Sequence, residues 1–320
     1  MKRTERNLLI TVSLVLVSLF LLSSTDLFLS EKKNDVYVIS VLIDDDTSKN
    51  WDNFRMGMDR AAEKWNADVS FVTLYDKGNT LQQEQLLKRE VENGTQAIIL
   101  SPADCDALTE AVDDIPAAIP VIALGARVES PRVRSVITAE PAVMGAELGA
   151  RIGIDDKMLA FSQVIEVTFR QNRTDTTLLS DSLRRALPDH LPVNRITVRS
   201  DAELDALMVR LDALTTPTAV VALDSTTLLS VAEKLEPSTQ DTVALYGVGW
   251  SSGLLPYIES GVICDVGVYS DYDIGYLSME AAIRYLQSEP VQKEYKVQQA
   301  LIPADQIHSK AYEMMLFPIV

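Results

Sequence analysis

Apolar residues along this chain alternate between short continuous runs and longer stretches in which they recur at helical spacing. The short runs are rich in Val, Ile and Leu, as in residues 36–43 (VYVISVLI), which is typical of strands buried on both faces. Between them, residues 51–65 carry apolar side chains on one helical face, and residues 81–91 form a second helical pattern that ends at an Asn-Gly pair. The pattern predicts alternating strands and helices up to a strand at residues 121–124.

The same alternation restarts near Val136. The strands predicted in this second series are residues 158–164, 195–198, 219–223, 243–248 and 262–268, with helices between them. Such alternation implies parallel sheets with right-handed crossovers, so the sequence predicts an α/β protein with two doubly wound lobes. Ligands bind outside the carboxyl ends of the strands in such sheets, and we therefore expect the functional residues in the loops that follow strands.

The N-terminal sequence predicts on which side of the membrane the protein works. Lys2, Arg3 and Arg6 precede a largely apolar run over residues 8–22, and positive charge before such a run keeps the N-terminus in the cytoplasm. The run has a length between those of a signal peptide and a short membrane anchor. Neither an Ala-x-Ala cleavage site nor a cysteine for lipidation follows it. We expect an uncleaved signal anchor over residues 1–30, with the binding domain outside the cytoplasm; a cleaved signal peptide is the alternative.

The composition excludes several kinds of partner and site. A formal net charge of −17 repels phosphate backbones, which argues against a nucleic-acid partner. The two cysteines, Cys105 and Cys264, belong to no CxxC or Cys/His cluster, so we expect no metal site. We expect no cofactor either, because the Gly-x-Gly-x-x-x-Gly pattern of residues 247–253 lacks the dinucleotide-binding spacing. The two histidines, His190 and His308, are far apart in the sequence, and a histidine-based catalytic centre is not expected.

Several longer segments together carry a family signal, because their order and spacing match while no single motif is specific. They are DDDTSKNWDNFRMGMDRAAEKW (44–65), QQEQLLKREVENGTQAIILSPAD (82–104), IPVIALG (119–125), VVALDSTTLLSVAEKL (220–235), YGVGWSSG (246–253) and GVICDVGVYSDYDIGYLSMEAAIRYL (261–286). In this order they resemble the type I periplasmic binding proteins, specifically the sugar-binding proteins of the ribose-binding type. The resemblance extends over most of residues 36–307.

The resemblance implies a hinge at which the chain crosses between lobes three times, near residues 125–128, 270–272 and 296–299. The N-lobe would then comprise residues 35–125 and 271–297, and the C-lobe residues 126–270 and 298–320. Ligand closes such a hinge because both lobes contact the same molecule only in the closed form.

Sugar recognition combines aromatic rings, which stack on C–H faces, with charged or amide groups that hydrogen-bond to hydroxyls. In the first lobe the acids that follow the first strand, Asp44 and Asp45, and the ring of Trp51 are expected in the cleft, although Trp51 could instead pack with Phe54. By resemblance, Asp104 after LSP is a hydroxyl-binding aspartate. Arg127 at the first crossing is either a ligand donor or a hinge ion-pair partner.

In the second lobe the resemblance implies a cleft arginine, which Arg173 or Arg170 would have to supply because the usual position is absent. Asp224 stands where the family has Asn or Asp, and Tyr269 stands at a polar cleft position. Trp250 replaces the aspartate that is common in sugar binders. That change exchanges a hydroxyl acceptor for a stacking ring and places a simple ribose specificity in doubt.

These features predict a solute-binding receptor that closes on a sugar or sugar-like molecule and serves an ABC importer. The alternative is a membrane-anchored sensing component that presents its ligand to a sensor kinase. A repressor would need an N-terminal helix-turn-helix, and the apolar run occupies that place. A glycosidase would need paired carboxylates such as Asp104 and Asp224 across the cleft, but the family has no such activity, and we expect no enzyme.

Overall fold

The computed structural model describes residues 11–17, 36–44, 51–76, 78–154, 161–169 and 174–318. Residues 11–17 form a short helix in a unit of their own, Met1–Val36, and the remainder, Tyr37–Val320, forms one compact unit. Among the described helices, none has the length and apolar character needed to cross a bilayer. Most of the predicted anchor lies outside the described residues, so the anchor stays a prediction.

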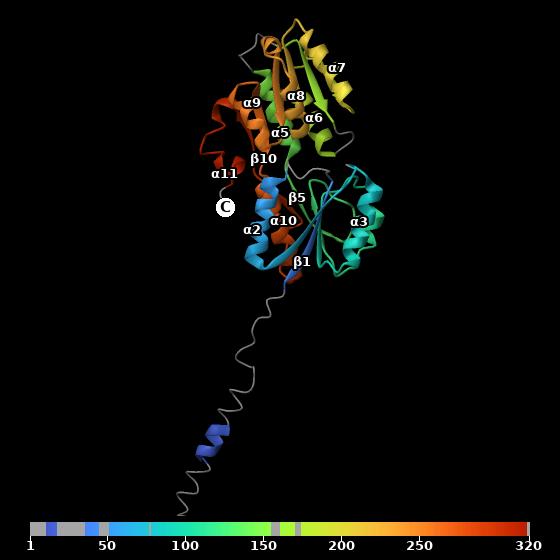
Figure 1. The fold of residues 1–320 in the computed structure, drawn as a ribbon, viewed down its shortest axis with the longest axis vertical. Coiled ribbons are helices and arrows are strands. Elements are labelled where there is room, and N and C mark those ends of the chain that lie inside the picture. Colours follow the sequence, from blue (N-terminus) through green and yellow to red (C-terminus); the bar gives the residue numbers. More distant parts are fainter. Residues whose placement is uncertain are drawn as a thin grey trace, which may run out of the picture. The chain divides into compact units, whose positions relative to one another are not determined.

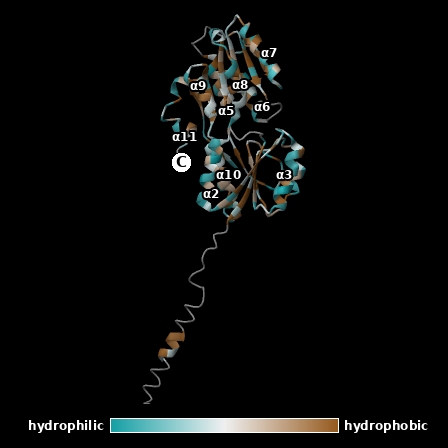
Figure 2. Cartoon of the chain, viewed as in Figure 1, coloured by the Kyte–Doolittle hydropathy of each residue, from teal (hydrophilic) through white to brown (hydrophobic). Residues whose placement is uncertain are grey.

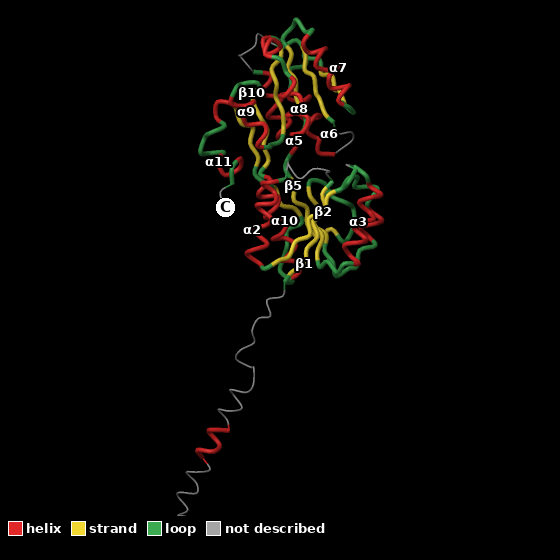
Figure 3. The backbone as a smooth tube through the Cα atoms, in the orientation of Figure 1, coloured by secondary structure: helices red, strands yellow, loops and turns green. Residues whose placement is uncertain are grey.

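The larger unit holds two six-stranded sheets, drawn as two groups of strands in Figure 3. The first sheet is parallel throughout, in the order β11-β5-β4-β3-β1-β2. Its strands are β1 (Tyr37–Ile43), β2 (Ala67–Thr73), β3 (Ala97–Leu100), β4 (Val121–Leu124), β5 (Val133–Thr138) and β11 (Glu294–Lys296).

The second sheet has the order β12-β10-β9-β8-β6-β7, and only its edge strand β12 runs antiparallel to its neighbour β10. Its strands are β6 (Gln163–Thr168), β7 (Val193–Thr197), β8 (Thr218–Ala222), β9 (Val243–Val248), β10 (Ile263–Tyr269) and β12 (Gln299–Pro303). Two α/β lobes with parallel sheets, as the alternating pattern predicted, are therefore confirmed.

Helices cover both faces of each sheet (Figure 1). In the first lobe, α2 (Asp52–Trp65) and α10 (Asp271–Leu286) lie on one face, and α3 (Thr80–Glu92) and α4 (Thr109–Asp113) lie on the other. In the second lobe, α5 (Pro141–Gly153) and α6 (Thr174–Ala186) share one face. The opposite face carries α7 (Asp201–Asp212), α8 (Ser225–Lys234), α9 (Leu255–Glu259), α11 (Glu313–Leu316) and 3-10 turns at Pro237–Asp241, Ser252–Leu254 and Ala304–Gln306.

Two-sided coverage explains why the strands read as continuous apolar runs. In β1, Ile39, Val41 and Ile43 pack toward α2 and α10, while Leu42 packs toward α3 and α4. All four side chains are almost completely buried. Figure 2 shows the same arrangement, with apolar strands inside and more polar helices around them.

One predicted strand begins later than the sequence pattern indicated. The apolar pattern predicted residues 158–164, whereas β6 runs over Gln163–Thr168, and residues 155–160 lie outside the described part of the chain. The charged Glu166 interrupts the apolar run, yet it is fully buried in β6. Arg184 and Arg195 donate to its Oε2 at 3.0 and 2.9 Å, which supplies the partners that a buried carboxylate requires.

The position of β5 bears on the predicted lobe boundary. A boundary at residues 125/126 would assign this strand to the second lobe, but β5 pairs with β4 and β11 in the first sheet. The chain therefore leaves the first sheet only after Thr138. It crosses again between β10 and α10, at Ser270, and between β11 and β12, at residues 297–298.

Helix α10 returns to the first lobe and packs tightly on α2. A Cβ added at Gly57 would lie 2.0 Å from the Tyr272 carbonyl oxygen, and one added at Gly275 would lie 2.0 Å from that of Phe54. The two helices therefore cross at a distance that only glycine allows at these two positions.

Candidate functional site

A cavity of about 180 Å³ lies at the carboxyl ends of the strands and draws residues from both sheets. The lining includes the ends of β4, β5, β9 and β10, together with the loops after β3 and β8. Its residues are Trp51, Ser101, Leu124, Gly125, Ile137, Thr138, Ala139, Pro141, Asp175, Thr176, Leu179, Leu223, Val248, Tyr269, Asp271 and Ile274. The volume suits one small ring, since a cavity of roughly 150 Å³ accommodates benzene.

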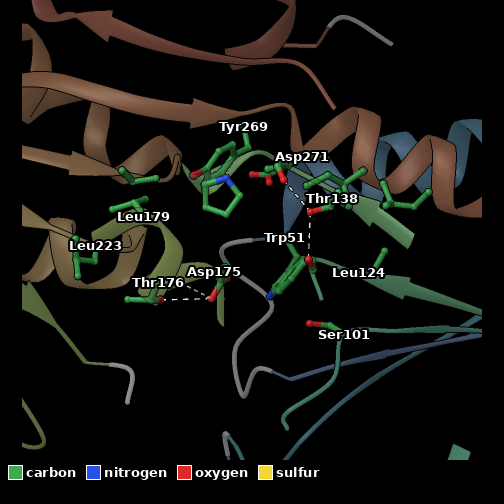
Figure 4. Close-up of a pocket in the computed structure, with 16 residues that line it drawn as sticks. Trp51, Ser101, Leu124, Thr138, Asp175, Thr176, Leu179, Leu223, Tyr269 and Asp271 are labelled. Carbon is green, nitrogen blue, oxygen red and sulfur yellow. Dashed lines mark hydrogen bonds between the residues drawn. The ribbon is translucent and has the colours of Figure 1, made fainter. Parts of the chain in front are cut away.

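Two of the aromatic side chains that line this cavity, Trp51 and Tyr269, also carry hydrogen-bond donors (Figure 4). Trp51, the residue before α2, packs edge-on against Phe54 with ring centroids 5.4 Å apart, so it has both of the roles considered for it, packing and lining. Its Nε1 and the hydroxyl of Tyr269 are buried without a hydrogen-bond partner in the described structure. Leaving a buried donor unpaired costs about 1–3 kcal/mol, so ligand acceptors at these atoms would be favoured.

Tyr269 remains a neutral phenol. Burial raises the pKa of its hydroxyl well above the usual value, and the nearby carboxylates of Asp175 and Glu147 raise it further. Its O–H is therefore available as a donor across the pH range in which the protein would work.

Two carboxyl groups also line the cavity. Asp271 is half-buried at the first position of α10, and burial raises its pKa to about 7. Asp175 lies in the first turn of α6, where its Oδ1 accepts a hydrogen bond from the Thr176 backbone N–H at 2.8 Å. The described lining contains no Lys, Arg or His. Carboxyl groups beside aromatic donors match the donors and acceptors of a neutral hydroxyl-rich molecule.

Four of the acidic or basic residues predicted for the cleft do not line this cavity, and each has a partner elsewhere. Asp44, at the end of β1, is buried, and its Oδ1 accepts from the Gly78 N–H at 2.7 Å. Asp104 is exposed and accepts from the backbone of residues 106 and 107, which closes a local turn. Arg127 is exposed and lies 4.0 Å from the Glu129 carboxylate.

Asp224 caps α8. Its Oδ1 accepts from the Thr227 N–H at 2.9 Å, and its Oδ2 accepts from the hydroxyls of Thr227 and Thr168 at 2.7 and 3.3 Å. Its neighbour Leu223, rather than Asp224, lines the cavity. Asp45 and Arg173, which were also predicted for the cleft, lie outside the described residues, as does Arg170.

Trp250 lies apart from Trp51 and lines a different hollow. Its ring is 7% exposed and belongs to the core of the second lobe. Its Nε1 donates to the Leu316 carbonyl at 3.1 Å, and its ring meets that of Phe317 edge-on with centroids 5.6 Å apart. The structure thus brings Trp51 and Tyr269 together, and it places Trp250 beneath the C-terminal segment.

Sequence reasoning missed Asp271, Asp175, Ser101 and Thr138. An acidic residue in the first turn of a helix is usually explained by the helix dipole, so Asp271 and Asp175 gave no separate signal. The one available indication for Asp271 was its place at the predicted second crossing, two residues after Tyr269. Thr138 was missed because the first crossing was expected earlier in the chain.

Two α/β lobes around a cavity at their strand ends define a two-lobed solute-binding protein. The chain belongs to the periplasmic binding protein family, whose domain model matches residues 39–290. Members of this family are solute-binding proteins and not enzymes, and their binding domains work outside the cytoplasm. No curated protein matches the chain in sequence.

Solved structures share this fold at low sequence identity. A carbohydrate transporter solute-binding protein from Agrobacterium radiobacter in complex with D-arabinose has a TM-score of 0.80 and 17% identity, over 88% of this chain and 99% of that one. A solute-binding protein from Agrobacterium vitis with bound D-fucose has a TM-score of 0.77 and 17% identity, over 88% and 100% of the two chains.

A third similar structure is a complex of a sensor domain with a binding protein. The TorS sensor domain–TorT complex, crystallised in the absence of ligand, matches with a TM-score of 0.74 and 17% identity, over 88% of this chain and 98% of that one. At this level of identity the likeness shows the shared fold.

Proposed function

We propose that this protein is an extracytoplasmic receptor that closes its two lobes on a sugar or sugar-like molecule and delivers it to an ABC importer. The observation that carries the proposal is the cavity between the two sheets, in which Trp51 and Tyr269 offer unpartnered donors beside the carboxyl groups of Asp175 and Asp271. A sugar ring satisfies both kinds of group, since each hydroxyl can donate and accept. The arabinose and fucose complexes of similar fold support this ligand class.

The way the cavity is built supports closure. Its walls come from two sheets, between which the chain crosses near Thr138, Ser270 and residues 297–298. A ligand that contacts both walls binds the closed form better than the open form and shifts the population toward it.

A second candidate function is ligand presentation to a sensor kinase. The similarity to TorT in its complex with a sensor domain favours this alternative, and so does the predicted N-terminal anchor, because an anchored receptor need not diffuse. We propose a single N-terminal pass for either role.

A thermal-shift screen with monosaccharides tests the ligand class. A ligand at 100 times its dissociation constant adds about 2.7 kcal/mol to the free energy of unfolding, which gives a clear rise in melting temperature. An unchanged melting temperature with every sugar in the panel would contradict the proposed ligand class.

Uptake of the identified ligand by cells that lack this protein then separates the two roles. Lost uptake indicates the importer, whereas normal uptake with a lost transcriptional response to the ligand indicates the sensor.

A further inference from the structure

A second chamber of about 390 Å³ adjoins the ligand cavity. Its walls come from the first turns of α2, the loop after β9 and the end of the described chain. The lining residues that matter here are Asp52, Met56, Trp250, Ser251, Ser252 and Phe317. Asp271 lines both hollows, so the two are neighbours on either side of this side chain.

The chamber has the chemistry of a sugar subsite. Trp250 and Phe317 supply aromatic surface. The Ser251 hydroxyl is buried without a hydrogen-bond partner, and the carboxyl groups of Asp52 and Asp271 supply acceptors. An aromatic wall, an unpartnered polar atom and carboxyl groups are also what the first cavity offers to its ring.

The chamber is bounded on one side by the C-terminal segment. The Leu316 carbonyl accepts hydrogen bonds from the Asn53 amide at 3.2 Å and from Trp250 Nε1 at 3.1 Å. These bonds keep Phe317 beside Trp250 and tie the segment to the first turn of α2, and residues of both elements line the chamber.

We propose that this chamber is a second subsite, and that the ligand is a disaccharide whose two rings lie on either side of Asp271. The proposal rests on the proposed function and names its ligand class more narrowly. The first cavity, at about 180 Å³, holds one ring, and the second, at about 390 Å³, has room for another. Trp250, which stands in place of an aspartate, contributes to the lining of the second subsite, and the more exposed Phe317 supplies most of its aromatic surface.

Isothermal titration with matched sugars tests the proposal. The probes are D-glucose with maltose and cellobiose, D-galactose with lactose and melibiose, and D-arabinose and D-fucose alone. We expect at least one disaccharide to bind about tenfold more tightly than its component monosaccharide, a gain expected from one additional aromatic contact.

A blocking variant assigns that gain to the chamber. Ser252 is exposed at its edge, so Ser252→Phe should fill the chamber without disturbing the core. The matched control is Ser238→Phe, the same substitution at an exposed serine that lines neither cavity. The affinity for the disaccharide should fall to that for the monosaccharide in Ser252→Phe and stay unchanged in Ser238→Phe. Met56→Trp, from the opposite wall, serves if Ser252→Phe does not fold.

The outcomes separate the two proposals. Monosaccharide binding with no gain for any disaccharide, or a gain that survives both blocking variants, overturns the second subsite and leaves the proposed function standing. A complete lack of binding by every sugar overturns both.

Discussion

Replacing Asp271 with asparagine should stabilise the ligand-free protein at alkaline pH and leave its stability unchanged at acidic pH. Burial raises the pKa of this carboxyl group from 3.8 to about 7 in the folded protein. At about pH 3 and below, the carboxyl group is mostly protonated in both the folded and the unfolded chain. As the pH rises from about 3 through 7, the unfolded chain ionises first, and the folded protein loses stability relative to it.

The size of this loss follows from the shift. About three pKa units at 1.36 kcal/mol each give about 4 kcal/mol, and solvent reaching a half-buried group reduces this to about 2–4 kcal/mol. An opposing term comes from the helix dipole, since an ionised Asp271 at the start of α10 gains about 0.3–1 kcal/mol. The desolvation cost is larger, so Asn should be the more stabilising residue at pH 8.

Chemical denaturation of the wild type and of Asp271→Asn at half-unit steps from about pH 3 to pH 8 measures this difference. Comparing two proteins at each pH cancels the titration of the other carboxyl groups. A difference close to zero at about pH 3 that grows to about 2–4 kcal/mol at pH 8 supports the reasoning. A constant difference, or a variant that becomes less stable as the pH rises, would refute it.

Three further predictions follow from the site and the N-terminus. Trp51→Ala should weaken sugar binding by about 1–3 kcal/mol in a fluorescence titration, because the ring lines the cavity. The control Trp65→Ala should leave the affinity intact, and equal effects of the two changes would contradict the prediction. Saturating ligand should reduce the radius of gyration in small-angle scattering through lobe closure, and no change from an open ligand-free form would count against the hinge. The full-length protein should remain with membranes after a high-salt wash and retain its first 30 residues; a soluble mature form that begins near Ser30 would exclude the anchor.

The fold could be predicted from the sequence because strands buried on both faces read as apolar runs, with helical periodicity between them. The prediction failed locally where a buried charge broke the pattern, as at Glu166, whose arginine partners come from α6 and β7. Such a partnership joins distant segments, and no local pattern reveals it.

The candidate site was less accessible to sequence reasoning. Strand ends and aromatic residues pointed to the region of this cavity, which Trp51 and Tyr269 line, and their contact with a ligand stays a prediction. Acidic residues such as Asp104 and Asp224 look alike in sequence whether they face a ligand or cap a turn, and here they cap. The distinction depends on side-chain direction, which is set by contacts between elements and not by residue type.

The crossing of α2 and α10 has a consequence for the order in which the chain folds. Gly57 packs against Tyr272, which comes more than two hundred positions later in the chain. The edge strand β11 of the same lobe comes later still. The first lobe therefore cannot complete its core while the second is being synthesised. Contacts at such separation close slowly, because a long loop must be ordered before the contacts that stabilise it form. A chain that has to reach the far side of a membrane before folding benefits from this delay.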